Sequence, residues 1–174
     1  MALITVEVTA VSRNSGTRRR ARQQGLVVAT AQDLFSHAIK AAFGPALRSA
    51  VLRGSGRSYY LPCRTHFALL GFQKSQSSSS GDVKFTVNLK VVSIATWRDM
   101  RRARPDFPLR PAPSIRYGSF EWNKRIGDLL PSGEDKWWHM EGGQNNSTII
   151  AEVVGVLTNI AVHAMRMQLE AASG

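Results

Sequence analysis

Four side chains that can both donate and accept hydrogen bonds lie in two neighbouring strand-like segments, residues 66–76 and 83–91. They are Gln73, Ser75, Thr86 and Asn88. Side chains alternate between the two faces of a strand, so a hairpin that pairs Gln76 with Val83 places all four on one face. These four residues are therefore candidates for a ligand- or partner-binding surface. The alternative is that these groups only bond neighbouring loops and water.

The same register predicts an apolar opposite face with three cross-strand pairs, which are Phe72–Val87, Leu70–Leu89 and Ala68–Val91. Gly71 falls opposite Asn88, and its missing side chain is expected to leave a groove above the backbone. A sheet with one apolar and one polar face is either half solvated or forms the floor of a polar site. The sequence leaves both possibilities open.

An arginine and two tryptophans further along the chain are candidates for the same site. Arg125 lies in a strand-like segment, and its planar guanidinium can bind a carboxylate or a phosphate. Its expected structural partner is Asp135 or Glu134. Trp137 and Trp138 point to opposite sides if they lie in a strand, so one is expected in the core. The other would then be exposed and mark an interface.

The chain is strongly basic, with 23 Lys and Arg residues against 12 Asp and Glu residues, a formal net charge of +11 and a pI near 10.9. Such a charge favours a polyanionic partner. One basic block lies within residues 1–25, a segment without apolar periodicity that is expected to be flexible. Another contains Arg98, Arg101, Arg102 and Arg104, which are candidates for nucleic-acid contacts. A genome rich in arginine codons would explain the same composition.

No pattern of metal ligands or nucleotide-binding glycines is present in the sequence. The histidines are scattered, and none shares a ligand spacing with a cysteine or a second histidine. We therefore expect neither a metal ion nor a cofactor. A lone cysteine, Cys63, cannot form an intramolecular disulfide, which favours a cytoplasmic protein. The apolar stretch 149–162 is too short to span a bilayer comfortably, so no membrane partner is expected.

The first half of the chain predicts two helices followed by three antiparallel strands. Thr30 is a plausible helix N-cap, and apolar residues recur at helical spacing from Leu34 to Phe43. Gly44-Pro45 is expected to interrupt this helix and to start a second one ending near Leu52. The aromatic segment 57–61 then predicts a strand that precedes the hairpin.

The second half predicts a short helix over 95–103, an extended proline-rich connection over 104–114 and further strands. Segments 116–122 and 124–130 have strand-like character, and with 137–140 they fit a second small hairpin. A long amphipathic helix is predicted from Ser147 to Ala171, covering the apolar face of the sheet.

Together these elements predict a single α+β domain over residues 26–174. Its antiparallel sheet of about five strands would pack against an N-terminal helix pair and a long C-terminal helix. Four short motifs occur in one order along this domain: Gln73-Lys74-Ser75, Phe85-Thr86-Val87-Asn88-Leu89, Arg125-Ile126-Gly127 and Asp135-Lys136-Trp137-Trp138.

This order of motifs resembles the family called domain of unknown function 4304, from about Leu34 to Met165. The chain departs from the family pattern at Lys90, where a glycine is expected, and at residues 53–56, which lack a Gly-Phe pair. The resemblance implies a small soluble bacterial α/β domain without an established reaction.

Three functions remain open from the sequence. The preferred one is a non-catalytic module that binds another protein through the polar hairpin face, Arg125 and a tryptophan. The second is a nucleic-acid-binding protein that uses the arginine-rich segments. The third is a hydrolase or nuclease whose carboxylates meet only in the fold. The oligomeric state is not predicted.

Overall fold

The computed structural model describes residues 29–172, which begin with a well-capped helix. Helix α1 (Ala31–Ala38) follows Thr30, whose hydroxyl accepts a hydrogen bond from the Asp33 N–H while the Asp33 carboxylate accepts one from the Thr30 N–H. This reciprocal arrangement is a capping box. The predicted helix start at Thr30 is confirmed, whereas the expected flexibility of residues 1–25 and their basic block lie outside the described residues.

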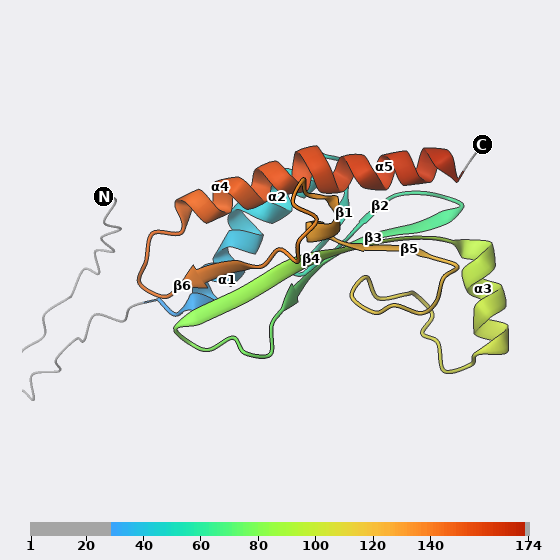
Figure 1. Cartoon of the computed structure of the whole chain (residues 1–174), viewed down its shortest axis with the longest axis horizontal. Helices are drawn as coiled ribbons and strands as arrows, with labels where there is room; N and C mark the ends of the chain where they lie inside the picture. The colour runs from blue at the N-terminus through green and yellow to red at the C-terminus, as the bar shows by residue number, and fades with distance from the viewer. Residues whose placement is uncertain (1–28, 173–174) are drawn as a thin grey trace, which may run out of the picture.

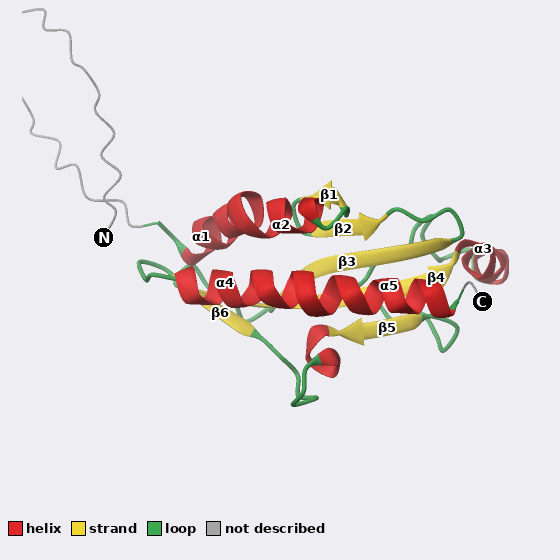
Figure 2. Cartoon of the chain, turned by 90° about the horizontal axis from the view of Figure 1, so that it is seen from above, coloured by secondary structure: helices red, strands yellow, loops and turns green. Residues whose placement is uncertain are grey.

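The second predicted helix follows the first without a loop. A π-helical turn, Ile39–Phe43, connects α1 to α2 (Gly44–Ser49), and the segments run on from each other in Figure 2. The Gly44 N–H donates to the Ile39 carbonyl five residues back, so the helix is already widened where Pro45 removes a donor. The expected interruption at Gly44-Pro45 is therefore a π turn within one continuous helical segment.

Within the described residues, six antiparallel strands form one sheet. They are β1 (Arg53–Ser55), β2 (Ser58–Leu61), β3 (His66–Lys74), β4 (Asp82–Ser93), β5 (Trp122–Arg125) and β6 (Trp138–Glu141). The strand order is β1-β2-β3-β4-β5, and β6 pairs with β4 (Figure 1). Strand β1 was not predicted. It pairs with β2 through a tight turn at Gly56 and Arg57, in which Gly56 takes a positive φ angle of 57°, and Gly54 within the strand has a φ angle of 127°.

The predicted register of the central hairpin is confirmed. Phe72 pairs with Val87, Gly71 pairs with Asn88, and Gln73 pairs with Thr86. The predicted apolar face is buried in the main hydrophobic core. The period-two pattern therefore identified both the register and the inward face.

The second small hairpin is a wrong prediction, because β5 and β6 do not pair with each other. Strand β5 pairs with residues 88–91 of β4, and β6 pairs with residues 82–85 of the same strand. The twelve residues of β4 are long enough to carry both short strands end to end along one edge. Residues 116–121 precede β5 as a loop, and Ile126–Leu129 form a 3-10 turn, so neither segment extends the strand.

The long C-terminal helix covers the apolar face of the sheet, as predicted (Figure 1). It consists of α4 (Ser147–Val156), a π-helical turn Leu157–Ala161 and α5 (Val162–Ala171). Its buried residues include Val153, Leu157, Ala161 and Met165, which recur every four positions. A π turn has more residues per turn than the 3.6 of an α-helix, which helps to keep this spacing on one face.

By length and composition alone, Ser147–Ala171 is also long and apolar enough to cross a bilayer, the one such helix in residues 29–172. A helix that packs on a protein core passes the same test, and the buried residues of this helix contact the sheet. The expectation that no membrane is involved stays a prediction.

The second face of the sheet is partly covered by helix α3 (Ile94–Ala103) and the connection over residues 104–121. The proline-rich part of this connection contains neither helix nor strand, as expected. It nevertheless carries the buried Phe107, whose ring stacks on Trp97 at 5.3 Å between centroids. Pro113 lies over Gly71, where a Cβ would come within 2.5 Å of the proline ring. The groove expected above Gly71 is therefore filled.

Candidate functional site

The polar face of the hairpin continues onto β5, because Arg125 is directly opposite Asn88 in the β4–β5 ladder. Residues opposite each other in antiparallel strands project from the same face of the sheet. Arg125 therefore joins Gln73, Thr86 and Asn88 on one face, as the sequence predicted.

Two of these polar groups are buried and satisfied by the protein itself. Thr86 is 0% exposed, and its hydroxyl donates to the Lys136 carbonyl at 2.8 Å. Asn88 is 5% exposed, and its Nδ2 donates to Gln73 Oε1 at 2.8 Å. These bonds hold β3, β4 and the segment before β6 together. Thr86, Gln73 and Asn88 therefore hydrogen-bond to other parts of the protein, which is the alternative considered in the sequence analysis.

Ser75 keeps the predicted pairing with β4, but its hydroxyl bonds within the loop. It lies one residue beyond β3, and its N–H still donates to the Lys84 carbonyl at 2.8 Å, so the predicted register of Ser75 with Lys84 is retained. Its hydroxyl bonds to the hydroxyl of Ser77 at 2.8 Å. A role for Ser75 in a binding surface stays a prediction.

Gly127 allows a distant segment to reach the site. A Cβ at this position would lie 2.0 Å from the Glu134 carbonyl oxygen and 2.6 Å from the Lys136 nitrogen. Only a residue without a side chain permits such a backbone approach. The contact brings Asp135 beside Arg125, whose Nη1 donates to both carboxylate oxygens at 2.9 and 2.8 Å. The predicted partner of Arg125 is confirmed as Asp135.

Trp137 forms a fixed, partly exposed platform beside this ion pair. Its indole Nε1 donates to Asp135 Oδ2 at 2.8 Å. Two cations lie near its ring, with Arg125 Cζ at 5.3 Å and Lys84 Nζ at 5.4 Å from the centroid. Such cation–π contacts stabilise one position of the ring. Trp137 is thus oriented by three neighbours, Asp135, Arg125 and Lys84.

Trp138 points to the opposite side and is 3% exposed. Its ring stacks on Phe85 in the core at 5.6 Å between centroids, and its Nε1 donates to Glu152 on α4 at 3.0 Å. Glu152 also forms an ion pair with Lys136. The prediction that one tryptophan is in the core is confirmed for Trp138, whereas Trp137, which precedes β6, is only partly exposed.

A polar groove of about 360 Å³ runs beside the platform and is referred to as the Arg125 groove. It is lined by Asn88, Ser114, Arg116, Asn123, Arg125, Asp128 and Asp135. Sequence reasoning missed Ser114, Arg116, Asn123 and Asp128. Asn123 precedes Arg125 by two residues, so strand alternation could have placed it on the same face. The loop that brings in Ser114 and Arg116 left no comparable signal.

The two carboxylates of the groove are both engaged by Arg125. Asp128 accepts a hydrogen bond from the Arg125 backbone N–H at 3.0 Å, and Asp135 binds its guanidinium. Hydrogen bonds from Arg125 and then Trp137 lower the pKa of Asp135. A general acid needs a raised rather than a lowered pKa to hold its proton near neutrality. Asp135 therefore lacks the raised pKa that a general acid requires.

A family model for a domain of unknown function, DUF4304, matches residues 43–166. The chain belongs to the DUF4304 family. The resemblance inferred from the four motifs is confirmed, although the match begins nine residues later than Leu34. No curated protein and no solved structure matches the chain.

The four motifs that carry the DUF4304 resemblance meet at the site. Gln73 bonds to Asn88, Thr86 bonds to the Lys136 carbonyl, and Arg125 binds Asp135. Each of these contacts joins two different motifs. The motifs are thus separate in sequence but form one hydrogen-bonded unit in the fold.

The arginines of the α3 region are largely paired within this DUF4304 chain. Arg102 binds Asp99, and Arg104 binds Asp106. The Arg101 Nε donates to the Phe107 carbonyl at 3.3 Å. Arg98 is exposed. Neighbouring carboxylates therefore reduce the positive charge that this segment can offer to a nucleic acid.

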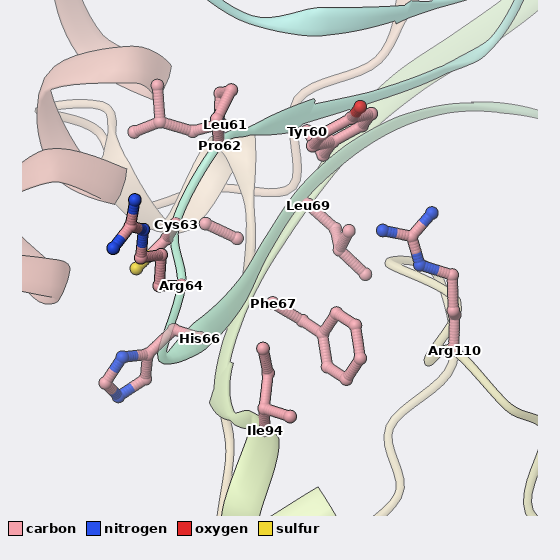
Figure 3. Close-up of a pocket in the computed structure, with 11 residues that line it drawn as sticks. Tyr60, Leu61, Pro62, Cys63, Arg64, His66, Phe67, Leu69, Ile94 and Arg110 are labelled. Carbon is pink, nitrogen blue, oxygen red and sulfur yellow. The ribbon is translucent and has the colours of Figure 1, made fainter.

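A second pocket of about 420 Å³ lies beside Cys63 at the start of β3. In Figure 3 the Cys63 sulfur and the His66 ring lie on one side of the β3 ribbon, whereas Phe67 and Leu69 lie on the other. The Thr65 hydroxyl connects Cys63 to His66 by contacts of 3.4 and 2.9 Å. Desolvation raises the pKa of the thiol, but hydrogen bonds with Thr65 and nearby backbone groups outweigh it and lower the pKa. No direct bond between thiol and imidazole is present.

Within the part of the chain that the structure describes, no group of three or more His, Cys, Asp or Glu residues could hold a metal ion. The Arg125 groove offers two carboxylates: Asp135 binds the Arg125 guanidinium, and Asp128 accepts a hydrogen bond from the Arg125 backbone N–H. The expectation of a metal-free protein stays a prediction.

Proposed function

We propose that this DUF4304 protein is a non-catalytic interaction module that binds another protein at Trp137 and the Arg125 groove. The observation that carries the proposal is the fixed position of the partly exposed Trp137 among Asp135, Arg125 and Lys84. Tryptophan and arginine are the residues most enriched among binding hot spots. A side chain that is already ordered loses little conformational entropy on binding.

The groove beside Trp137 suits a polypeptide better than a strongly charged ligand. It contains Arg116 and Arg125 together with Asp128 and Asp135, so its formal charges balance. Amide and hydroxyl groups of Asn123 and Ser114 complete the lining. A peptide backbone with mixed side chains can use such alternating donors and acceptors. The groove also follows β5, which lies at the margin of the sheet in Figure 2.

Nucleic-acid binding remains a weaker proposal because no single observation favours it. The four candidate arginines near α3 include two that already bind aspartates, Arg102 and Arg104. Hydrolytic activity is likewise less supported, since the Arg125 guanidinium pairs with Asp135 and leaves one groove carboxylate, Asp128, without an ion pair to any described residue.

The test compares Trp137→Ala and Arg125→Ala with a matched control, Arg104→Ala. Arg104 also binds an exposed aspartate and also lies over an aromatic ring, that of Phe107, at 5.0 Å. The tagged full chain is purified from cells that naturally make it, and retained proteins are identified by mass spectrometry. Each purified candidate partner is then titrated by calorimetry.

We expect about a tenfold or greater loss of affinity for Trp137→Ala and Arg125→Ala, and less than a twofold loss for Arg104→Ala. Thermal melts check that all variants remain folded. The proposal is refuted if a specific partner binds all variants equally, or if affinity is lost only where the fold is lost.

A further inference from the structure

A cavity under α1 is separate from the Arg125 groove and has about 600 Å³ of space. This volume lies in the range of pockets that hold small organic ligands. It is referred to as the α1 cavity and is lined by Gln32, Phe35, Ser36, Ile39, Lys40, Ser55, Gly56, Arg57 and Lys74. No residue of the Arg125 groove is shared with it.

The cavity exists because β2 is shorter than β3. Strand β2 pairs with β3 only from Ala68 to Gly71, whereas β3 continues to Lys74. The β1–β2 turn at Gly56 and Arg57 therefore stops short of α1 and leaves a gap at the edge of the sheet. The floor of the gap is formed by Phe35 and Ile39, core side chains of the α1 segment.

Three cations surround this apolar floor, and no carboxylate lines it. Lys40 and Arg57 are exposed. Among the described residues, no ion pair connects Lys40, Arg57 or Lys74 to an acidic side chain. This contrasts with the Arg125 groove, where arginines and aspartates are balanced.

Two consecutive hydrogen bonds hold Lys74 at the wall of the α1 cavity. Its ammonium donates to Gln32 Oε1, and Gln32 Nε2 donates to the Ser79 carbonyl at 2.8 Å. Lys74 follows Phe72 by two positions, so alternation places both on the face that α1 covers. The charge is therefore fixed beside the apolar floor.

The main chain of β3 adds a further donor at this edge. The Phe72 N–H points toward the β1–β2 turn, because it donates to the Arg57 carbonyl at 2.9 Å. Backbone groups two residues apart in a strand point to the same side, so the Lys74 N–H also faces the side where β2 has ended.

From this combination we infer that the α1 cavity binds a small organic anion, in which a carboxylate or phosphate head is attached to an apolar chain or ring. The head contacts Lys40, Arg57 and Lys74, and the apolar part lies over Phe35 and Ile39. Unpaired cations around an apolar floor are complementary to this class of molecule and not to a neutral or cationic one.

The test titrates the full chain with 4-phenylbutyrate, phenyl phosphate, the neutral analogue 4-phenylbutanol and acetate, using ¹⁵N-resolved NMR shifts. We expect 4-phenylbutyrate or phenyl phosphate to bind at least about tenfold more tightly than 4-phenylbutanol and acetate, with shifts centred on α1 and the β1–β2 turn. The preferred anion identifies the head group as carboxylate or phosphate.

Three variants locate the binding. Arg57→Ala and Lys40→Ala should each weaken the anion severalfold, and Ser36→Trp should block the cavity from its exposed rim without removing a core side chain. A matched exposed cation elsewhere, Arg102→Ala, should leave the affinity unchanged. The inference is overturned if neither anion binds, if the alcohol binds equally well, or if Ser36→Trp and Arg57→Ala retain full affinity.

Discussion

The buried ion pair between Lys90 and Glu121 is expected to be the most sensitive polar contact on the second face of the sheet. Both side chains are 0% exposed, and Lys90 Nζ lies 2.5 Å from Glu121 Oε2. Glu121 Oε1 also accepts a hydrogen bond from the Tyr117 N–H at 2.8 Å. The Lys90 ammonium additionally lies 5.0 Å from the centroid of the Tyr117 ring. These contacts fix the connection over residues 104–121 on the sheet.

Removing one partner leaves the other without a compensating charge. Glu121→Ala should lower the free energy of unfolding by about 3–5 kcal/mol, the cost typical of breaking a buried pair from one side. The matched control is Asp99→Ala, which breaks an ion pair with Arg102 whose side chains are 74% and 68% exposed. That change should cost about 0–1 kcal/mol, because solvent screens an exposed pair.

The pH dependence of the free energy of unfolding gives a second test, because the structure predicts whether stability rises or falls with pH. Burial lowers the pKa of Lys90, while the hydrogen bond and charge of Glu121 raise it less strongly. Between this lowered pKa and the ordinary value of 10.5, the unfolded chain binds more protons than the folded one. Stability therefore rises with pH across this window and is lost as pH falls through the folded pKa. Without Glu121 the folded pKa drops further, so the rise should begin at a lower pH.

Urea denaturation between pH 7 and 10, followed by tryptophan fluorescence, measures both effects. Trp97 is a suitable reporter because its ring lies 4.7 Å from that of Tyr117. A loss for Glu121→Ala no larger than that for Asp99→Ala would refute the reasoning. The reasoning would also be refuted if the free energy of unfolding of Glu121→Ala did not rise between pH 7 and 10.

Three further predictions concern the core and the site. Leu89→Asp should lower the free energy of unfolding by roughly 3–5 kcal/mol, because Leu89 is 0% exposed in the core. Asn88→Ala should lower it by only about 1–2 kcal/mol. Equal losses of the two variants in urea denaturation would mean that the apolar and polar faces of the hairpin are assigned the wrong way round. Gly127→Ala should cost at least about 2 kcal/mol, since its Cβ would overlap the Glu134 carbonyl, and an unchanged melting temperature would contradict this contact. The pKa of Asp135 is lowered from 3.8, so its ion pair should stabilise the fold above that pH and be lost as pH falls through the folded pKa. Asp135 is 53% exposed, so the ion pair should contribute at most about 1 kcal/mol. Melts from pH 2 to 6 should show this loss of stability at acid pH in the unmodified chain and not in Asp135→Asn. Identical pH profiles for the two proteins would exclude a contribution of this ion pair.

Much of the candidate site could be predicted from strand alternation. The common face of Gln73, Thr86 and Asn88 follows from a period of two and one correct register. The opposite sides taken by the buried Trp138 and the partly exposed Trp137 agree with the same rule, although Trp137 lies just before β6. What alternation could not supply was the neighbours on loops, namely Ser114 and Arg116, because no periodicity fixes where a loop crosses a sheet.

By itself, the sequence determined the local features of this protein: the helix start at Thr30, the register of the β3–β4 hairpin and the long C-terminal helix. Each depends on residues close in the chain, through capping, alternation or helical spacing. Only the tertiary structure decided that β5 and β6 share one edge of β4, that Gly127 receives the backbone of residue 134, and that Lys90 and Glu121 are buried together. These contacts join segments separated by loops of irregular path, and hydrophobic periodicity carries no information about such paths.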